Sequence, residues 1–76
     1  MTATIGDYLR LLRVERRLSQ TQIGTAAGVS QRQISRIEAG GALPDVAAFF
    51  RILAALNASS SEVAEACRLA RVDSRG

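Results

Sequence analysis

Two short helical patterns meet at a tight turn in residues 20–38, which read QTQIGTAAGVSQRQISRIE. The turn is Gly28-Val29-Ser30, and each of its residues suits that place. Glycine adopts the positive φ that ends a helix without steric cost. Serine is a favoured N-cap because its hydroxyl accepts a hydrogen bond from an N–H of the next helix. Val29 supplies apolar bulk at the corner, so this stretch predicts a helix-turn-helix.

Gly24 lies inside the first of these two helices. Glycine in a helix interior costs roughly 1 kcal/mol relative to alanine. Its presence therefore suggests a crossing that is too close for a Cβ atom, and the small side chain of Ala27 favours the same close approach.

The second helix has one apolar and one polar face when its residues are placed about 100° apart around the axis. Ile34 and Ile37 form the apolar face. Arginine can pair with O6 and N7 of guanine, and glutamine with N6 and N7 of adenine, in the major groove of DNA. The polar face has such donors and no acidic side chain, since it consists of Gln31, Arg32, Ser35 and Arg36.

Capping signals divide the rest of the chain into further helices. A Ser or Thr followed three residues later by Gln, Glu or Asp is typical of a capping box. Pairs of this kind that suit a helix start are Thr4/Asp7, Ser19/Gln22, Ser30/Gln33 and Ser59/Glu62. Pro44-Asp45 marks one more helix start, and no alternating run suits a strand. We therefore expect an all-α domain with helices over about residues 5–17, 20–27, 31–38, 45–56 and 60–71.

Helices this short are marginal alone in water, so they must share one apolar core. The last helix carries a stripe of small and apolar residues, Val63, Ala66, Cys67 and Ala70. This stripe either completes the core of the monomer or forms a dimer surface, and we favour the dimer surface. The predicted core is Leu9, Leu12, Leu18, Ile23, Ala27, Val29, Ile34, Ile37, Val46, Phe49, Leu53, Leu56 and Val63.

Length and composition exclude several classes of function. A chain of 76 residues makes a single domain over residues 1–76. It has no His and only one Cys, so a zinc site, a disulfide or a Cys/His nucleophile cannot form within it. We expect no enzyme, no metal, no cofactor and no small-molecule ligand. The chain has no run of about 18 apolar residues and no signal-peptide pattern at its start, so we expect no membrane and a cytoplasmic location.

The net charge of +3 is unevenly distributed. Residues 1–38 hold six Arg against three acidic residues, which gives +3, whereas residues 39–76 hold four of each. The excess suits a face that meets a polyanion, although an unevenly charged, solvated surface would give the same count.

The order of these motifs resembles the Cro/phage-repressor type of helix-turn-helix domain, also called the xenobiotic-response-element family. The similarity covers about residues 5–65. It implies a compact five-helix, lambda-repressor-like fold that places the helix over residues 31–38 in the major groove. It also implies a homodimer that binds a palindromic operator in double-stranded DNA and regulates transcription, as a repressor or control protein. The residues that carry the resemblance are Leu18-Ser19-Gln20, Ile23, Ala27-Gly28-Val29-Ser30, Ile34-Ser35, Ile37-Glu38, Gly40, Pro44 and Leu56.

The resemblance also implies roles for single residues. The base readers would be Gln31, Arg32 and Arg36. Gln20 would contact a phosphate at the N-terminus of its helix, where N–H groups and the helix dipole favour anions. Arg13 would pair with Glu38 as a structural ion pair. Weaker candidates for backbone contacts are Ser19, Thr21, Ser30 and Ser35.

Two departures from the family pattern concern the DNA backbone. Arg17 stands where many relatives have Gly, so this helix end either closes differently or adds a phosphate contact. The loop over residues 39–43 lacks the Lys or Arg that relatives often carry there. Backbone binding by this loop would then be weaker or depend on N–H groups.

Several residues have a structural interpretation beside the functional one. Gln22 and Gln33 are favoured as cap partners over DNA contacts. The cluster Arg10, Arg13, Arg16 and Arg17 is either a second phosphate strip or, as is usual for a charged helix face, solvated.

The alternative function is a protein-interaction module, such as an antitoxin or adaptor, that keeps the fold. The basic, acid-free face of the helix over residues 31–38 argues against it.

Overall fold

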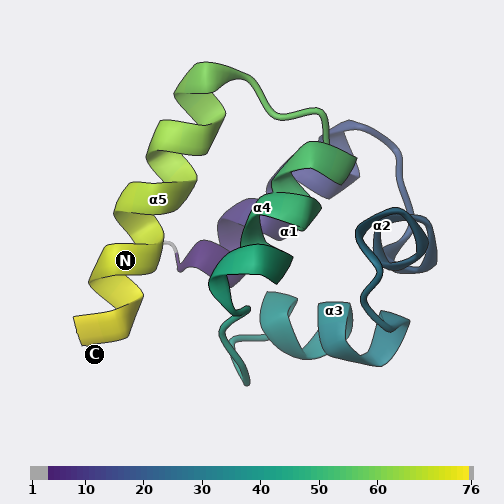
Figure 1. The fold of residues 1–76 in the computed structure, drawn as a ribbon, viewed down its shortest axis with the longest axis horizontal. Helices are drawn as coiled ribbons and strands as arrows, with labels where there is room; N and C mark the ends of the chain where they lie inside the picture. Colours follow the sequence, from purple (N-terminus) through teal and green to yellow (C-terminus); the bar gives the residue numbers. More distant parts are fainter. Residues whose placement is uncertain (1–3, 76) are drawn as a thin grey trace.

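The computed structural model describes residues 4–75, with side chains described for residues 4–72, and contains five helices and no strand in that part of the chain (Figure 1). The helices are α1 (Ile5–Glu15), α2 (Gln20–Ala27), α3 (Gln31–Glu38), α4 (Val46–Ala55) and α5 (Ser60–Arg75). The all-α, five-helix prediction is confirmed. Some ends differ from it, since α1 stops earlier and α5 runs further than expected, while α4 is shorter by one residue at each end.

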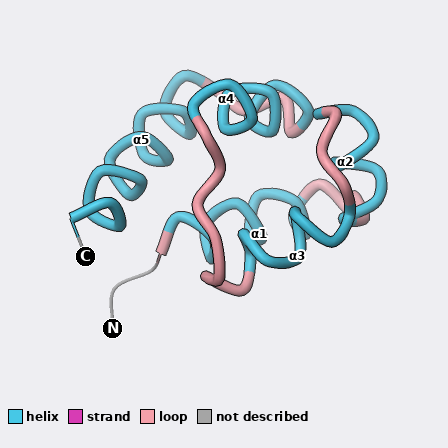
Figure 2. Tube along the Cα trace, turned by 60° about the horizontal axis from the view of Figure 1, so that its bottom comes forward, coloured by secondary structure: helices cyan, strands magenta, loops and turns pink. Residues whose placement is uncertain are grey.

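The helices form a compact body in which α2 packs against α3 and α4, while α1 packs against α3 and α5. The molecule measures 29 × 25 × 24 Å along its principal axes. Figure 2 shows α2 and α5 at opposite ends, with α4 between them on one side. No described helix has the length and apolar character needed to cross a membrane.

Side-chain caps begin each of these helices, as the capping signals predict. The hydroxyl of Ser19 accepts a hydrogen bond from the N–H of Gln22 at 2.9 Å, and Gln22 Oε1 accepts one from the N–H of Ser19 at 2.7 Å. The pairs at the starts of α1 and α5 are equally reciprocal. Asp45 caps α4 through the N–H of Ala48 at 2.7 Å. Such caps stabilise a helix by about 1 kcal/mol each.

The first four helices end in the same way, with one residue in the left-handed conformation. Two of these residues are glycines, Gly28 at φ 70° and Gly40 at φ 85°. The other two are Arg17 at φ 56° and Asn57 at φ 55°. After α1, the N–H of Leu18 reaches the carbonyl oxygen of Arg13 at 3.1 Å, which is the hydrogen bond of a Schellman motif. Arginine therefore closes α1 with the geometry that glycine usually supplies.

Most of the predicted core is buried, with one clear error. Val46 is 74% exposed at the first position of α4. Leu18, Val29 and Val63 are partly buried against the core. The prediction missed Ile5, Ala48, Ile52, Ala66 and Leu69, which are all buried.

The stripe on α5 completes the core of the monomer, so our preference for a dimer surface there is wrong. Ala66 is fully buried, and Val63, Cys67 and Ala70 pack against the core. Across the same contact, Arg16 Nη2 of α1 donates to Glu62 Oε1 of α5 at 2.5 Å. The inner face of α5 is therefore occupied within one chain.

Candidate nucleic-acid interface

The turn between α2 and α3 has the predicted geometry. Gly28 is left-handed, and the N–H of Val29 donates to the carbonyl oxygen of Gly24 at 2.8 Å. A Cβ on Gly24 would collide with the carbonyl oxygen of Val29. The prediction that no Cβ fits is confirmed, but the obstacle is the backbone of the turn and not the facing helix.

The two faces of α3 are separated as the helical wheel predicts. Ile34 and Ile37 are 3% and 2% exposed in the core. On the outer side Gln31, Arg32 and Arg36 are exposed. Within the described part of the chain, the side chains of Arg32 and Arg36 make no hydrogen bond or ion pair. Their guanidinium groups are therefore available to a ligand from outside.

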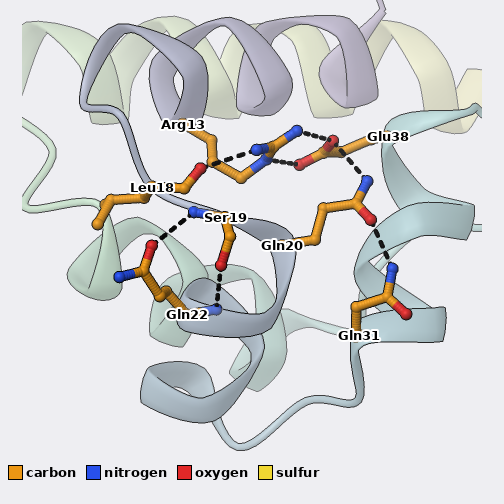
Figure 3. A network of polar contacts seen from close by, with 7 residues as sticks. All are labelled: Arg13, Leu18, Ser19, Gln20, Gln22, Gln31 and Glu38. Carbon is orange, nitrogen blue, oxygen red and sulfur yellow. Dashed lines mark hydrogen bonds and ion pairs between the residues drawn. The ribbon is translucent and has the colours of Figure 1, made fainter.

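A bidentate ion pair joins α1 to the end of α3, as the resemblance implies. Arg13 Nε lies 2.7 Å from Glu38 Oε2, and Nη2 lies 2.9 Å from Oε1 (Figure 3). Both side chains are largely buried, with 14% of Arg13 and 6% of Glu38 exposed. The hydrogen bond to Glu38 raises the pKa of Arg13, so this cation stays charged. A third hydrogen bond, from Arg13 Nη1 to the carbonyl oxygen of Leu18 at 2.8 Å, ties the pair to the α1–α2 loop.

Two glutamines at the outer surface continue the hydrogen-bond network of this ion pair. Gln20 Nε2 donates to Glu38 Oε1 at 3.1 Å, and Gln31 Nε2 donates to Gln20 Oε1 at 2.6 Å (Figure 3). A glutamine amide has two N–H donors and an oxygen with two lone pairs. Gln31 therefore keeps its Oε1 and one N–H for a partner, and Gln20 keeps one N–H. These hydrogen bonds within the chain orient both amides before any ligand binds.

The sequence interpretation did not foresee this glutamine pair. It placed Gln20 at a helix N-terminus and Gln31 on the groove face without connecting them. Their contact depends on how α2 packs across α3. A helical wheel describes a single helix and gives no information about this packing. A signal does exist, because a long amide at the first residue of each helix permits such a contact.

Two of the remaining candidates lie at the starts of α2 and α3, and the third lies in the middle of α3. Thr21 is exposed in the first turn of α2. Ser30 is exposed, and its hydroxyl oxygen accepts the N–H of Gln33 at 3.1 Å, which leaves its O–H free to donate. Ser35 is half-buried on α3. Gln22 is a cap partner, as favoured, whereas Gln33 takes part in its cap through the backbone alone.

The arginines of α1 and its end are of two kinds. Arg13 and Arg16 form ion pairs with Glu38 and Glu62. Arg10 and Arg17 are exposed, and neither is paired with any residue that the structure describes. The cluster is therefore not a uniform strip, since half of it holds the fold together.

The described residues contain no group of three or more His, Cys, Asp or Glu side chains that could hold a metal ion.

Comparison with known proteins agrees with this geometry. The model of the helix-turn-helix domain family matches residues 4–72. Among solved structures, the restriction-modification controller protein C.AhdI from Aeromonas hydrophila is similar, with a TM-score of 0.72 and 24% sequence identity. The similarity covers 78% of this chain and 89% of that chain, and at this identity it shows a shared fold. No curated protein sequence matches the chain.

Proposed function

Because the chain belongs to the helix-turn-helix domain family of DNA-binding transcriptional regulators, we propose that it recognises a palindromic operator as a homodimer. The observation that carries this proposal is the outer face of α3, where the guanidinium groups of Arg32 and Arg36 are exposed and unpaired among the described residues. The proposal needs no catalysis and no cofactor. Occupancy of the operator would regulate transcription, as in a repressor or control protein, and such a protein would act in the cytoplasm.

In the proposed complex, α3 lies in the major groove and its outer side chains read bases. Arg32 and Arg36 each offer a planar fork of donors that suits guanine O6 and N7. Gln31 presents an amide oxygen beside an N–H, which is the pattern that adenine N6 and N7 require. Its hydrogen bond to Gln20 supports this role because the amide is held in place before binding.

The start of α2 is the proposed phosphate contact. Gln20 has one N–H left after bonding Glu38, and it stands at a helix N-terminus, which attracts anions. Thr21, Ser30 and Ser35 supply hydroxyl groups and are proposed as weaker backbone contacts. Phosphate contacts of this kind set the register of the protein on the duplex, and the bases then set specificity.

The dimensions of the domain support a dimer. Recognition helices of such dimers enter successive major grooves about 34 Å apart. Each domain is 24–29 Å across, so two copies side by side on one face of the duplex reach that spacing.

The proposed dimer surface is the apolar patch at the start of α4, since the stripe on α5 is used within the monomer. Leu43 is 51% exposed, Val46 74% and Phe50 50%. Leu43 and Val46 line an apolar hollow that Pro44 and Phe49 help to form. Clustered exposed apolar side chains of this size usually mark an interaction site. A second copy of the chain would cover them.

Selection of bound duplexes from a random pool tests the proposed function. We expect an inverted repeat whose half-sites lie about one helical turn apart. Affinity for the selected duplex should also fall steeply as salt rises, because arginine–phosphate contacts release counterions. Failure to enrich any sequence, or binding to a protein partner that salt leaves unchanged, would contradict the proposal and favour an interaction module.

A further inference from the structure

A polar pocket of about 280 Å³ lies between α1 and α3, beside the α3 face that we assign to DNA. It is lined from three helices, and Figure 3 shows how Arg13, Gln20 and Glu38 approach one another there. Nothing in the proposed base-reading role uses the α1 wall of this pocket. The lining residues are Arg10, Arg13, Gln20, Ser35, Glu38 and Ala39.

The charge of this pocket is not balanced. Glu38 is the one acidic residue of its lining, and Arg13 already holds both of its carboxylate oxygens. The side chain of Arg10 is exposed and forms no ion pair or hydrogen bond with any described residue. The pocket therefore carries a net positive charge that belongs to Arg10.

Donors without a partner surround this charge. The hydroxyl of Ser35 makes no hydrogen bond to any described residue, and Gln20 has one free N–H after bonding Glu38. A tetrahedral oxyanion offers several acceptors, and a guanidinium with a hydroxyl and an amide N–H suits it well. The chemical class that fits the pocket is thus a phosphate group.

We propose that this pocket holds a backbone phosphate of the bound duplex, with Arg10 as its main ligand and Ser35 and Gln20 as supporting donors. This inference rests on the proposed function, because the phosphate is delivered when α3 enters the groove. It extends the DNA interface to α1 and separates Arg10 from Arg13 and Arg16, whose guanidinium groups are engaged within the fold.

Binding of Arg10→Ala to the selected duplex and to an unrelated duplex tests the pocket. A phosphate contact carries no sequence information, so both affinities should fall by the same factor, about tenfold for each of the two contacts that a dimer loses. The slope of log K against log salt should become shallower by about 0.9 for each contact, or about 1.8 for the dimer. Arg10→Lys should recover part of the loss. The midpoint of thermal unfolding should not change, since Arg10 has no partner in the fold.

Arg68→Ala is the matched control because it removes the same charge from α5, where Arg68 pairs with Glu65. It should leave the affinity and the salt slope unchanged. If Arg68→Ala weakened DNA binding as much as Arg10→Ala, the loss of affinity would come from the lower net charge of the protein. The proposed phosphate site would then be contradicted.

Single methylphosphonate substitutions in the selected duplex locate the contact. Neutralising one phosphate in each half-site should weaken binding by the wild-type protein strongly and binding by Arg10→Ala much less, because only the supporting donors Ser35 and Gln20 then lose a partner. The phosphate site is contradicted if Arg10→Ala binds DNA like the wild type while Arg32→Ala binds more weakly. That result leaves the proposed function unchanged. If the wild type bound no duplex, the phosphate site and the proposed function would both be contradicted.

Inorganic phosphate distinguishes a free anion from the duplex. An Arg10-dependent rise in Tm at millimolar phosphate, with DNA affinity unchanged in Arg10→Ala, would assign the pocket to a free anion. That result would overturn the DNA assignment.

Discussion

At the scale of the residue, Arg17 adopts a backbone conformation that is sterically unfavourable for a residue with a side chain. Its φ of 56° lies in the left-handed region, which costs an ordinary L-residue roughly 1–2 kcal/mol. It closes α1, yet its guanidinium pairs with nothing that the structure describes. Arg17 therefore adopts the left-handed backbone conformation that glycine usually supplies at a helix end.

Arg17→Gly should raise the free energy of unfolding by up to about 1 kcal/mol, since glycine adopts this conformation without a steric penalty. Urea denaturation of both proteins measures the change. Asn57→Gly is the matched control at the end of α4, where φ is 55°, and should gain less because asparagine tolerates the left-handed region. A loss of stability in Arg17→Gly would mean that the arginine side chain makes a contact that supports the fold.

The glutamines of the interface show what single positions in a sequence reveal. The wheel placed Gln31 on the outer face correctly, because burial of Ile34 and Ile37 fixes the rotation of α3. It did not reveal the hydrogen bond to Gln20, since that bond depends on the crossing of two helices. Sequence therefore identified the candidate residues but not their mutual orientation.

At the scale of the element, helix starts were predictable and helix ends less so. Starts follow from a local side-chain hydrogen bond, such as that between Ser19 and Gln22, which the sequence spacing already contains. Ends depend on one backbone conformation, which is obvious at Gly28 and hidden at Arg17. Val46 fits the apolar periodicity of α4 but is exposed, so a prediction from periodicity alone placed it wrongly in the core.

The start of α5 should make stability depend on pH. Hydrogen bonding with the backbone of Ser59, and then the charge of Arg16, lower the pKa of Glu62 from its ordinary value of 4.5. A carboxyl whose pKa is lower in the folded state stabilises the fold above its unfolded pKa and loses that contribution as pH falls through the folded pKa. The free energy of unfolding should therefore decrease below about pH 4.5.

Urea denaturation from pH 7 to pH 3 checks this expectation. Glu62→Gln is the control, because glutamine can complete the capping box but does not titrate. Its stability should fall less over the same range than that of the wild type. An equal decline in both proteins would show that other carboxyl groups cause the acid sensitivity.

At the scale of the whole molecule, the shape and the apolar surface favour a symmetric pair. A dimer that buries the patch of Leu43, Val46 and Phe50 should dissociate when Val46 becomes charged. Val46→Glu should sediment as a folded monomer, since the side chain is 74% exposed in the single chain. Its affinity for a two-half-site duplex should drop, while its affinity for one half-site should not.

Leu11→Glu is the matched control for this experiment, because Leu11 is similarly apolar and 52% exposed but lies on α1. It should remain dimeric. The interface would have to be moved to α1 if Leu11→Glu dissociated and Val46→Glu did not.

The charge asymmetry of the sequence has a structural explanation at this scale. The first half of the chain contains the excess of +3, and it folds into the helices that form the candidate interface. Two of its arginines are consumed by ion pairs with Glu38 and Glu62. The charge available to DNA is therefore concentrated on Arg10, Arg17, Arg32 and Arg36.

The central claim is that the outer face of α3 reads bases, and binding of Arg32→Ala and Gln31→Ala to single-base variants of the selected duplex tests it most directly. Each substitution should weaken binding about 5- to 150-fold for each half-site and abolish the preference at one base pair of each half-site, because one bidentate contact is worth about 1–3 kcal/mol. Arg68→Ala on α5 should bind as the wild type does. Unchanged affinity and unchanged base preference in both α3 variants would contradict the account.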